Sequence, residues 1–215
     1  MSKNVIDLTC EMYNSAPTMP MDPKLEISEH CNLNTLGYNL NRVTMSTHQG
    51  THLDVPYHFF NDGDTLSELD INRCICYAVK LDLVNKGQGE PINISDLMPY
   101  EQVICDGSSI LLHTGWDKVF PQQQFFVEQP YLTIELCRWL AKKKINLLGL
   151  DMPTVNPRDW KITHELLLGA GIIIVEGLCN MEQLPNEEFM FIGLPLKLHK
   201  CDGSPIRAVA VPLHQ

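Results

Sequence analysis

The chain has 215 residues, of which 44% are hydrophobic and 20% are charged. This length suits one sizeable globular domain, and the composition lacks the apolar deficit that keeps disordered chains unfolded. The formal net charge of -10 argues against a nucleic-acid partner, because binding to phosphates requires a concentrated basic surface.

The first residues do not resemble a targeting signal. Residues 1–7 lack the apolar core of a secretory signal peptide, and no apolar run reaches the roughly 18 residues that a membrane span needs. The eight cysteines are scattered along the chain, and in this context we expect them to be reduced thiols. We therefore expect a cytoplasmic protein without a membrane partner.

Short apolar runs rich in β-branched residues predict buried strands, which in chain order are residues 77–84, 109–113, 145–150, 171–175 and 206–211. Between them, residues 133–144 have the apolar spacing of a helix, with Thr133 as its N-cap. A second helix is predicted to begin near Thr163, with the hydroxyl as its cap, and to end at Gly169. This alternation predicts an α/β fold, in one domain that spans residues 1–215.

Two of the predicted strands end in a carboxylate. Asp151 follows residues 145–150, and Glu176 follows residues 171–175. Ligands of open α/β sheets collect at the carboxyl ends of strands, so both acids are candidate site residues. The alternative is an acid that only caps a loop, and for Asp151 taken alone we favour that interpretation.

The densest cluster of chemically active side chains lies in residues 48–58. His48, His52, Asp54 and His58 place three imidazoles and one carboxylate within eleven residues. Neutral imidazole and carboxylate are the ligands of zinc and of harder divalent ions such as manganese. Isolated histidines are usually ordinary hydrogen-bonded polar residues, and four others are interpreted in this way: His30, His113, His199 and His214.

The spacing of this cluster requires a turn. An unbroken strand, at about 3.3 Å per residue, would separate His48 from Asp54 by roughly 20 Å, too far for one metal ion. A helix is opposed by Gly50 and Pro56. Gly50 can adopt the backbone angles of a turn that brings His48 beside His52, while Asp54 shares a face of the chain with His52.

Three ligands from one tight loop leave coordination positions for water, which is typical of a catalytic rather than a structural metal site. His58 follows Pro56 and is spaced to flank such a metal. An imidazole there can take and return a proton near neutral pH, so we assign His58 as the general acid–base.

The pattern His48-x-Gly50-Thr51-His52-x-Asp54-x-Pro56-x-His58 resembles the signature of the cyclase family of metal-dependent hydrolases, which includes the bacterial kynurenine formamidases. Supporting similarity covers most of the chain, in residues 7–9, 111–116, 149–155 and 207–210, and in His164 and Glu176, twelve residues apart.

This resemblance implies a swivelling β/β/α barrel-like domain that assembles as a homodimer or homotetramer. It also implies two divalent metal ions, zinc or manganese. By similarity, His48, His52 and Asp54 would hold the first ion, Asp54 and Glu176 would bridge, and His164 would join the second.

The implied reaction is hydrolysis of a small amide or formamide, with N-formylkynurenine converted to kynurenine and formate. A metal-activated hydroxide would attack the carbonyl carbon, and His58 would pass the proton to the leaving group.

One position departs from the family pattern. Formamidases of this family carry an aromatic residue, usually tryptophan, in an early Pro-x-Trp-Pro segment that contacts the substrate, and here the segment is Pro17-Thr18-Met19-Pro20. Met19 is therefore the predicted substrate-binding residue, although methionine lacks the flat face of an aromatic ring.

Two alternatives remain open. Related family members open cyclic amides such as isatin, or lactones, and Met19 is compatible with such a substrate. A metal-dependent binding module without turnover is the other alternative. The joint presence of His58, His164 and Glu176 counts against it.

Overall fold

Seven strands close into a barrel at the centre of the structure, a computed structural model that describes residues 5–213. His214 and the two ends of the predicted domain 1–215 lie outside these described residues. The strands neighbour one another in the order β12-β11-β5-β7-β9-β10-β4, and β4 also pairs with β12, which closes the ring. Their bounds are β4 (His52–Asp54), β5 (Ile75–Asp82), β7 (Ser109–His113), β9 (Leu147–Leu150), β10 (Ile173–Glu176), β11 (Phe189–Pro195) and β12 (Gly203–Pro212). The predicted barrel-like α/β fold is confirmed.

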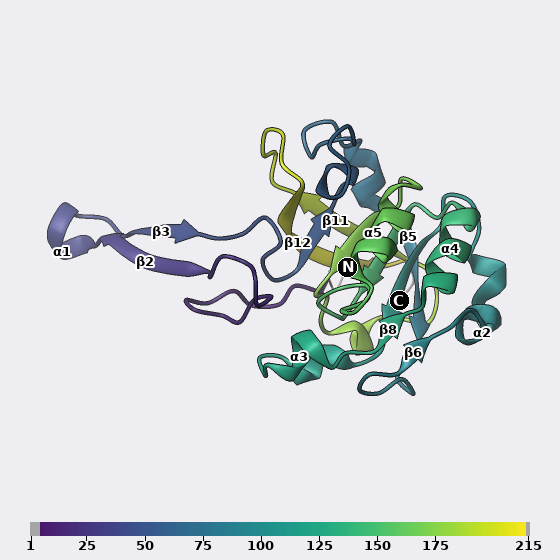
Figure 1. Cartoon of the computed structure of the whole chain (residues 1–215). Coiled ribbons are helices and arrows are strands. Elements are labelled where there is room, and N and C mark those ends of the chain that lie inside the picture. The colour runs from purple at the N-terminus through teal and green to yellow at the C-terminus, as the bar shows by residue number, and fades with distance from the viewer. Residues whose placement is uncertain (1–4, 214–215) are drawn as a thin grey trace.

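The parallel part of the barrel is buried on both faces. Strands β5, β7, β9 and β10 run parallel to one another, and helices α4 (Ile134–Lys143) and α5 (Trp160–Leu168) pack beside them (Figure 1). In β7, Leu111 belongs to the cluster inside the barrel, whereas Ile110 and Leu112 pack with Leu136 of α4. Burial on both faces explains why these strands are continuous apolar runs in the sequence.

The helix predictions are confirmed except for one boundary. Thr133 caps α4 and accepts a hydrogen bond from the backbone N–H of Leu136. Helix α5 ends at Gly169 as predicted, but it begins at Trp160 with Asp159 as its N-cap residue. The predicted start near Thr163 is wrong, because the Thr163 hydroxyl donates to the Asp159 carbonyl at 2.9 Å within an established helical turn.

The strand predictions are accurate where both faces are buried. Strand β7 has the predicted bounds, while β9 and β10 each begin two positions later than residues 145 and 171. Strand β5 begins and ends earlier than residues 77–84, and β12 extends beyond residues 206–211 at both ends. Strands β4 and β11 were not predicted.

A β-hairpin that was also not predicted projects from the body (Figure 1). It consists of β2 (Glu26–Cys31) and β3 (Leu40–Thr44), joined by the short helix α1 (Leu33–Leu36). The remaining strands and α-helices are β1 (Ile6–Asp7), which pairs with β12, β6 (Pro91–Ile92), β8 (Tyr131–Leu132), α2 (Ile94–Leu97) and α3 (Gln124–Val127). Within residues 5–213, no helix is long and apolar enough to cross a bilayer.

Candidate metal centre

The predicted turn within residues 48–58 is present. Gly50 has a φ of +64°, in the left-handed region that glycine adopts readily, and the chain then enters β4 at His52. Leu53 points into the barrel core, so His52 and Asp54 lie together on the outer face of β4. The turn therefore places His48 beside His52 and Asp54, two predicted ligands that share one face of a strand.

Strand β4 lies between β10 and β12, and carboxylates come from β10 and from the residue that precedes β12. In the β10 pairing, Glu176 is opposite His52, so the two side chains share the outer face. In the β12 pairing, Gly203 is opposite Asp54, which brings Asp202 to the same edge. The barrel pairings thus assemble a site from segments far apart in the sequence.

Helix α5 supplies His164. Its Nδ1 donates a hydrogen bond to the Trp160 carbonyl at 2.6 Å, which leaves Nε2 facing the carboxylates. That Nε2 lies 3.4 Å from Glu176 Oε1 and 3.9 Å from Asp54 Oδ2. The His164 side chain is buried. A histidine on a half-exposed helix can lie on the exposed side, so the helix alone does not explain this burial.

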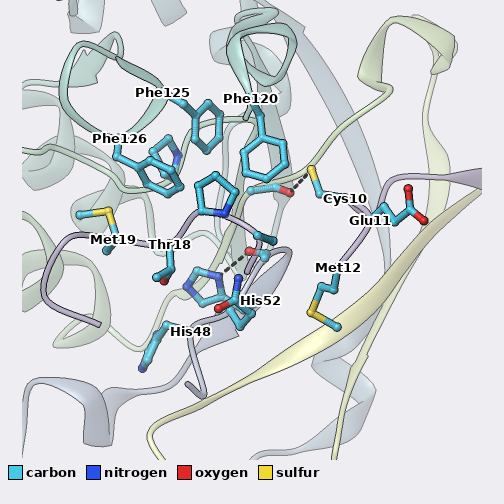
Figure 2. Close-up of a pocket in the computed structure, with 16 residues that line it drawn as sticks. Cys10, Glu11, Met12, Thr18, Met19, His48, His52, Phe120, Phe125 and Phe126 are labelled. Carbon is cyan, nitrogen blue, oxygen red and sulfur yellow. Dashed lines mark hydrogen bonds between the residues drawn. The ribbon is translucent and has the colours of Figure 1, made fainter. Parts of the chain in front are cut away.

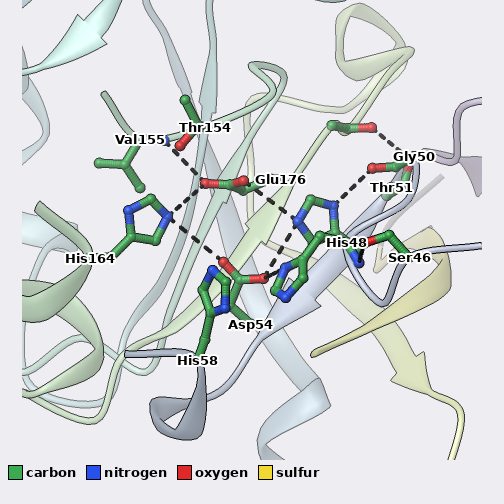
Figure 3. A network of polar contacts seen from close by, with 12 residues as sticks. Ser46, His48, Gly50, Thr51, Asp54, His58, Thr154, Val155, His164 and Glu176 are labelled. Carbon is green, nitrogen blue, oxygen red and sulfur yellow. Dashed lines mark hydrogen bonds and ion pairs between the residues drawn. The ribbon is translucent and has the colours of Figure 1, made fainter. Parts of the chain in front are cut away.

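His52 is oriented in the same manner, and Figure 3 shows His164, Glu176 and Asp54 in the network that it joins. Its Nδ1 donates to the Gly50 carbonyl at 2.9 Å, and its Nε2 lies 3.4 Å from Asp54 Oδ1 and 3.5 Å from Glu176 Oε2. Glu176 therefore faces His52 with one oxygen and His164 with the other. Both histidines present Nε2 to the same pair of carboxylates, an arrangement suited to metal coordination.

Two groups of potential ligand atoms share Asp54. In each group the atoms lie within 4.8 Å of one another: His48, Asp54 and His58 form one, and His52, Asp54 and Glu176 form the other. All five predicted ligands converge, because His164 contacts the second group. His58 lies closer to the ligands than a purely flanking residue, and its role as acid–base rather than ligand stays a prediction.

The donor set fits a divalent cation. Asp54 Oδ2 is buried and has no hydrogen-bond partner, which is costly for a carboxylate oxygen unless a cation neutralises it. Burial opposes ionisation of Asp54, yet the nearby His48 holds the pKa of this carboxyl well below its usual range. Imidazole nitrogens and carboxylate oxygens are ligands for zinc and for manganese.

The carboxylates of the site also favour positive charge on two nearby histidines, whose pKa values they raise. Burial alone would lower the pKa of His48, but the carboxylates of Asp54 and Asp202 raise it to about 11. Burial likewise opposes protonation of His164, and Glu176 reverses this effect, so its pKa is raised. Bound cations compete with such protons for the same carboxylates, so metal binding here is coupled to proton release.

A cavity of about 360 Å³ opens over the site. Besides the side chains predicted to bind metal, it is lined by Met19, Phe59 and Trp160. Figure 2 shows a smaller adjoining pocket, where Met19 lies near Phe126 on the side of His48 and His52. Met19 thus lines the space in which a substrate would be held, as its position in the sequence predicts, and the contact itself stays a prediction.

Three residues of the site were not predicted from the sequence. Asp202 precedes Gly203 and resembles an ordinary turn acid, yet it contacts both His48 and His58. Phe59 stacks on His164 with ring centroids 4.9 Å apart, and Trp160 lies 5.9 Å from Phe59. Proximity to His58 and His164 in the sequence was the only signal for the two aromatic residues, and Asp202 had none beyond its place before a strand.

Asp151 has the loop-capping role that was favoured for it alone. Its carboxylate accepts hydrogen bonds from the backbone N–H and hydroxyl of Thr114 and from the N–H of Gly115. His113 pairs with Asp82 at 2.7 Å, which agrees with its interpretation as a polar residue outside the site.

The comparisons with known proteins agree with this geometry. Residues 6–157 match the family model described as "Putative cyclase". The kynurenine formamidase of Bacillus cytotoxicus is 33% identical over 212 residues, covering 97% of each chain. Isatin hydrolase A from Labrenzia aggregata has the same fold, with a TM-score of 0.89, 22% identity and coverage of 98% of this chain and 94% of that one.

A further solved structure, described as a potential metal-dependent hydrolase with cyclase activity, superimposes with a TM-score of 0.82. It is 25% identical, and the match covers 99% of both chains. The family match extends over more than half of the chain, and the curated relative matches nearly all of it. The chain therefore belongs to the cyclase family.

Proposed function

We propose that this chain, as a single catalytic domain, is a metal-dependent hydrolase of non-peptide C–N bonds with an N-formyl arylamine such as N-formylkynurenine as its substrate. The observation that carries the proposal is the convergence of His48, His52, His164 and Glu176 on Asp54, whose Oδ2 is buried and has no hydrogen-bond partner. The similarity to kynurenine formamidases over nearly the whole chain supports the choice of substrate.

The proposed cofactor is a pair of divalent ions, zinc or manganese. Two ligand groups that share Asp54 support the number, with Glu176 facing His52 through one oxygen and His164 through the other. When bound, such ions activate water and polarise a carbonyl oxygen.

His58 is the proposed general acid–base. Its side chain is 28% exposed and lines the cavity, whereas the other site histidines are more deeply buried. Its Nδ1 faces Asp202, so Nε2 is the nitrogen available for proton transfer. His58 would take a proton as the carbonyl is attacked and return it to the departing amine.

An aromatic substrate is supported by the cavity walls. Trp160 is 53% exposed at its rim, and Phe59 lies 5.9 Å from the Trp160 ring. These rings offer flat surfaces that Met19 does not, so an aryl group can be recognised although the family tryptophan is replaced. A cavity of about 360 Å³ is also large enough for a bicyclic amide, and likeness in fold to isatin hydrolases makes isatin the second candidate.

A substrate panel tests the proposal. Protein loaded with zinc or with manganese is assayed on N-formylkynurenine, isatin and a small lactone, and we expect N-formylkynurenine to give the highest kcat/KM. The variant His58→Ala should keep its metal content and lose about 10²–10⁴-fold in kcat. The matched control is His199→Ala, an exposed histidine outside the site and outside the projecting hairpin, which should behave as wild type.

Preference for isatin would move the assignment to the cyclic-amide alternative. Ligand binding without hydrolysis across the panel would instead establish a binding module and refute the enzymatic proposal. Unchanged turnover in His58→Ala would refute the acid–base assignment, because proton transfer would then not depend on this imidazole.

We also propose that the protein acts in the cytoplasm as a homodimer or homotetramer. All eight cysteines are free thiols, which suits a reducing compartment. The projecting hairpin exposes Leu33, Leu36 and Tyr38 to 64%, 59% and 51%, and exposed apolar clusters of this kind mark contact surfaces. Light scattering should give a dimer or tetramer for wild type and a smaller species for Leu33→Asp combined with Leu36→Asp. A monomeric wild type would refute the assembly.

A further inference from the structure

Asp202 contacts two histidines of the metal centre with one oxygen. Its Oδ2 lies 2.8 Å from His48 Nε2 and 3.2 Å from His58 Nδ1. Its Oδ1 accepts a hydrogen bond from the Thr47 hydroxyl at 2.9 Å. The carboxylate is therefore held on both sides, although its side chain is 34% exposed.

The barrel closure determines the position of Asp202. Its backbone carbonyl accepts a hydrogen bond from the Val55 N–H at 3.1 Å, and the next residue, Gly203, pairs with Asp54. A side chain at Gly203 would collide with His48, since an added Cβ would lie 2.9 Å from His48 Cε1. The close approach allowed by glycine brings the Asp202 carboxylate within reach of the imidazoles.

These contacts assign a separate task to each ring nitrogen. A carboxylate beside His48 Nε2 leaves Nδ1 directed at Asp54 Oδ1, 2.8 Å away. A carboxylate beside His58 Nδ1 favours the tautomer with the proton on Nδ1, so Nε2 has a free lone pair. The two rings lie 4.0 Å apart between centroids, and one shared acceptor therefore fixes both orientations.

We propose that Asp202 is a positioning residue that fixes the tautomer of His58 and the orientation of His48 through a shared hydrogen-bond acceptor. The part that concerns proton transfer by His58 rests on the proposed hydrolase function. The part that concerns His48 rests on its position among the metal ligands alone. Carboxylates that orient metal-bound histidines typically contribute about 10–100-fold to metal affinity or activity.

The test compares Asp202→Ala and Asp202→Asn with Asp62→Asn, a control at an exposed aspartate. Zinc affinity is measured by calorimetry, and the tautomer of His58 by long-range ¹H–¹⁵N correlation spectra of the zinc-loaded protein. We expect Asp202→Ala to weaken zinc binding about 10–100-fold and to lose the predominance of the Nδ1–H tautomer. Asp202→Asn is isosteric and keeps one acceptor oxygen, so it should give a smaller effect and a folded variant for comparison.

Kinetics provide the second readout. In Asp202→Ala, kcat should fall by about 10–100-fold at saturating zinc while KM changes less, and the loss should vanish when His58→Ala is already present. Wild-type zinc affinity and an unchanged His58 tautomer in Asp202→Ala would overturn the proposal. If no variant hydrolyses any substrate, the proposed function fails, and the spectra and zinc affinity still decide the role of Asp202.

Discussion

Replacing Gly177 with alanine tests whether the turn at Gly50 holds the proposed metal ligands in place. Gly177 has a φ of +66°, and an added Cβ would lie 2.7 Å from the Gly50 carbonyl oxygen. The variant Gly177→Ala must therefore displace the Gly50 turn. Because that carbonyl accepts the hydrogen bond from His52 Nδ1, we expect the variant to lose both stability and metal affinity.

The loss of unfolding free energy has two contributions. Alanine in the left-handed region costs about 1–2 kcal/mol, offset by about 0.4–1 kcal/mol because alanine restricts the unfolded chain. Forced approach to packed backbone adds about 1–3 kcal/mol. Gly171→Ala is the matched control, since Gly171 has a φ of +76° and no atom lies within 4 Å of an added Cβ. Gly171→Ala therefore has the backbone cost of the left-handed region without the cost of forced approach to packed backbone.

Urea unfolding and zinc calorimetry of the two variants separate these contributions. We expect Gly177→Ala to be about 2 kcal/mol less stable than Gly171→Ala, which corresponds to a melting temperature lower by roughly 4–8 °C. Zinc affinity should fall by at least about tenfold in Gly177→Ala alone. Equal stability of the two variants, together with unchanged zinc affinity, would refute the reasoning.

Three further predictions concern the helix ends, a buried acid and the metal. Thr133→Ala should destabilise the protein by about 1 kcal/mol, because the N-cap of α4 is lost. Lys144→Gly should stabilise it by up to about 1 kcal/mol, because Lys144 has a φ of 54°, which glycine adopts more readily. Chemical denaturation measures both changes, and changes of the same sign would contradict these roles of the two helix ends. Burial raises the pKa of Asp151 from 3.8 to about 6, so between these values the native state retains a proton that the unfolded state releases. The unfolding free energy should therefore fall as pH rises from about 4 to about 6. Urea titrations should show this fall in wild type and not in Asp151→Asn, and identical pH slopes in the two proteins would count against it. Zinc added after chelation, at one hundred times the dissociation constant of the zinc complex, should stabilise the wild type by about 2.7 kcal/mol, measured as a rise in melting temperature. Asp54→Asn should lose most of that rise. An equal rise in both proteins would show that zinc binds elsewhere.

Features determined by neighbouring residues were predictable from the sequence. Thr133 caps α4 because its hydroxyl reaches an N–H three residues away, a contact that depends on local geometry alone. Strand β7 was predictable because its apolar residues follow one another without a break, which is the sequence pattern of a strand that is buried on both faces. The start of α5 was not predictable in this way, since Asn156 accepts from the N–H groups of Arg158 and Asp159 and leads the chain into the helix ahead of Thr163.

The same distinction applies to the candidate site. The turn at Gly50 was deduced from the requirement that His48 and Asp54 meet, which is a constraint within a few residues. His164 entered only through resemblance to a family. Glu176 was already a candidate as the acid at the end of a predicted strand, but its link to residues 48–58 also came from the resemblance, because no local pattern connects these segments. Their contacts with one another and with Asp54 come from the pairing of β10 with β4 and from the packing of α5.

Strand β4 has only three residues, yet its two pairings determine what the site contains. Pairing with β10 places Glu176 opposite His52, and pairing with β12 places Gly203 opposite Asp54, with Asp202 next to it. A shift of one residue in either pairing would turn the contributed side chain to the other face of the sheet. Closing the barrel and assembling the site are therefore the same structural event. A substitution that opens the β12–β4 pairing should abolish metal binding even when every ligand residue is retained.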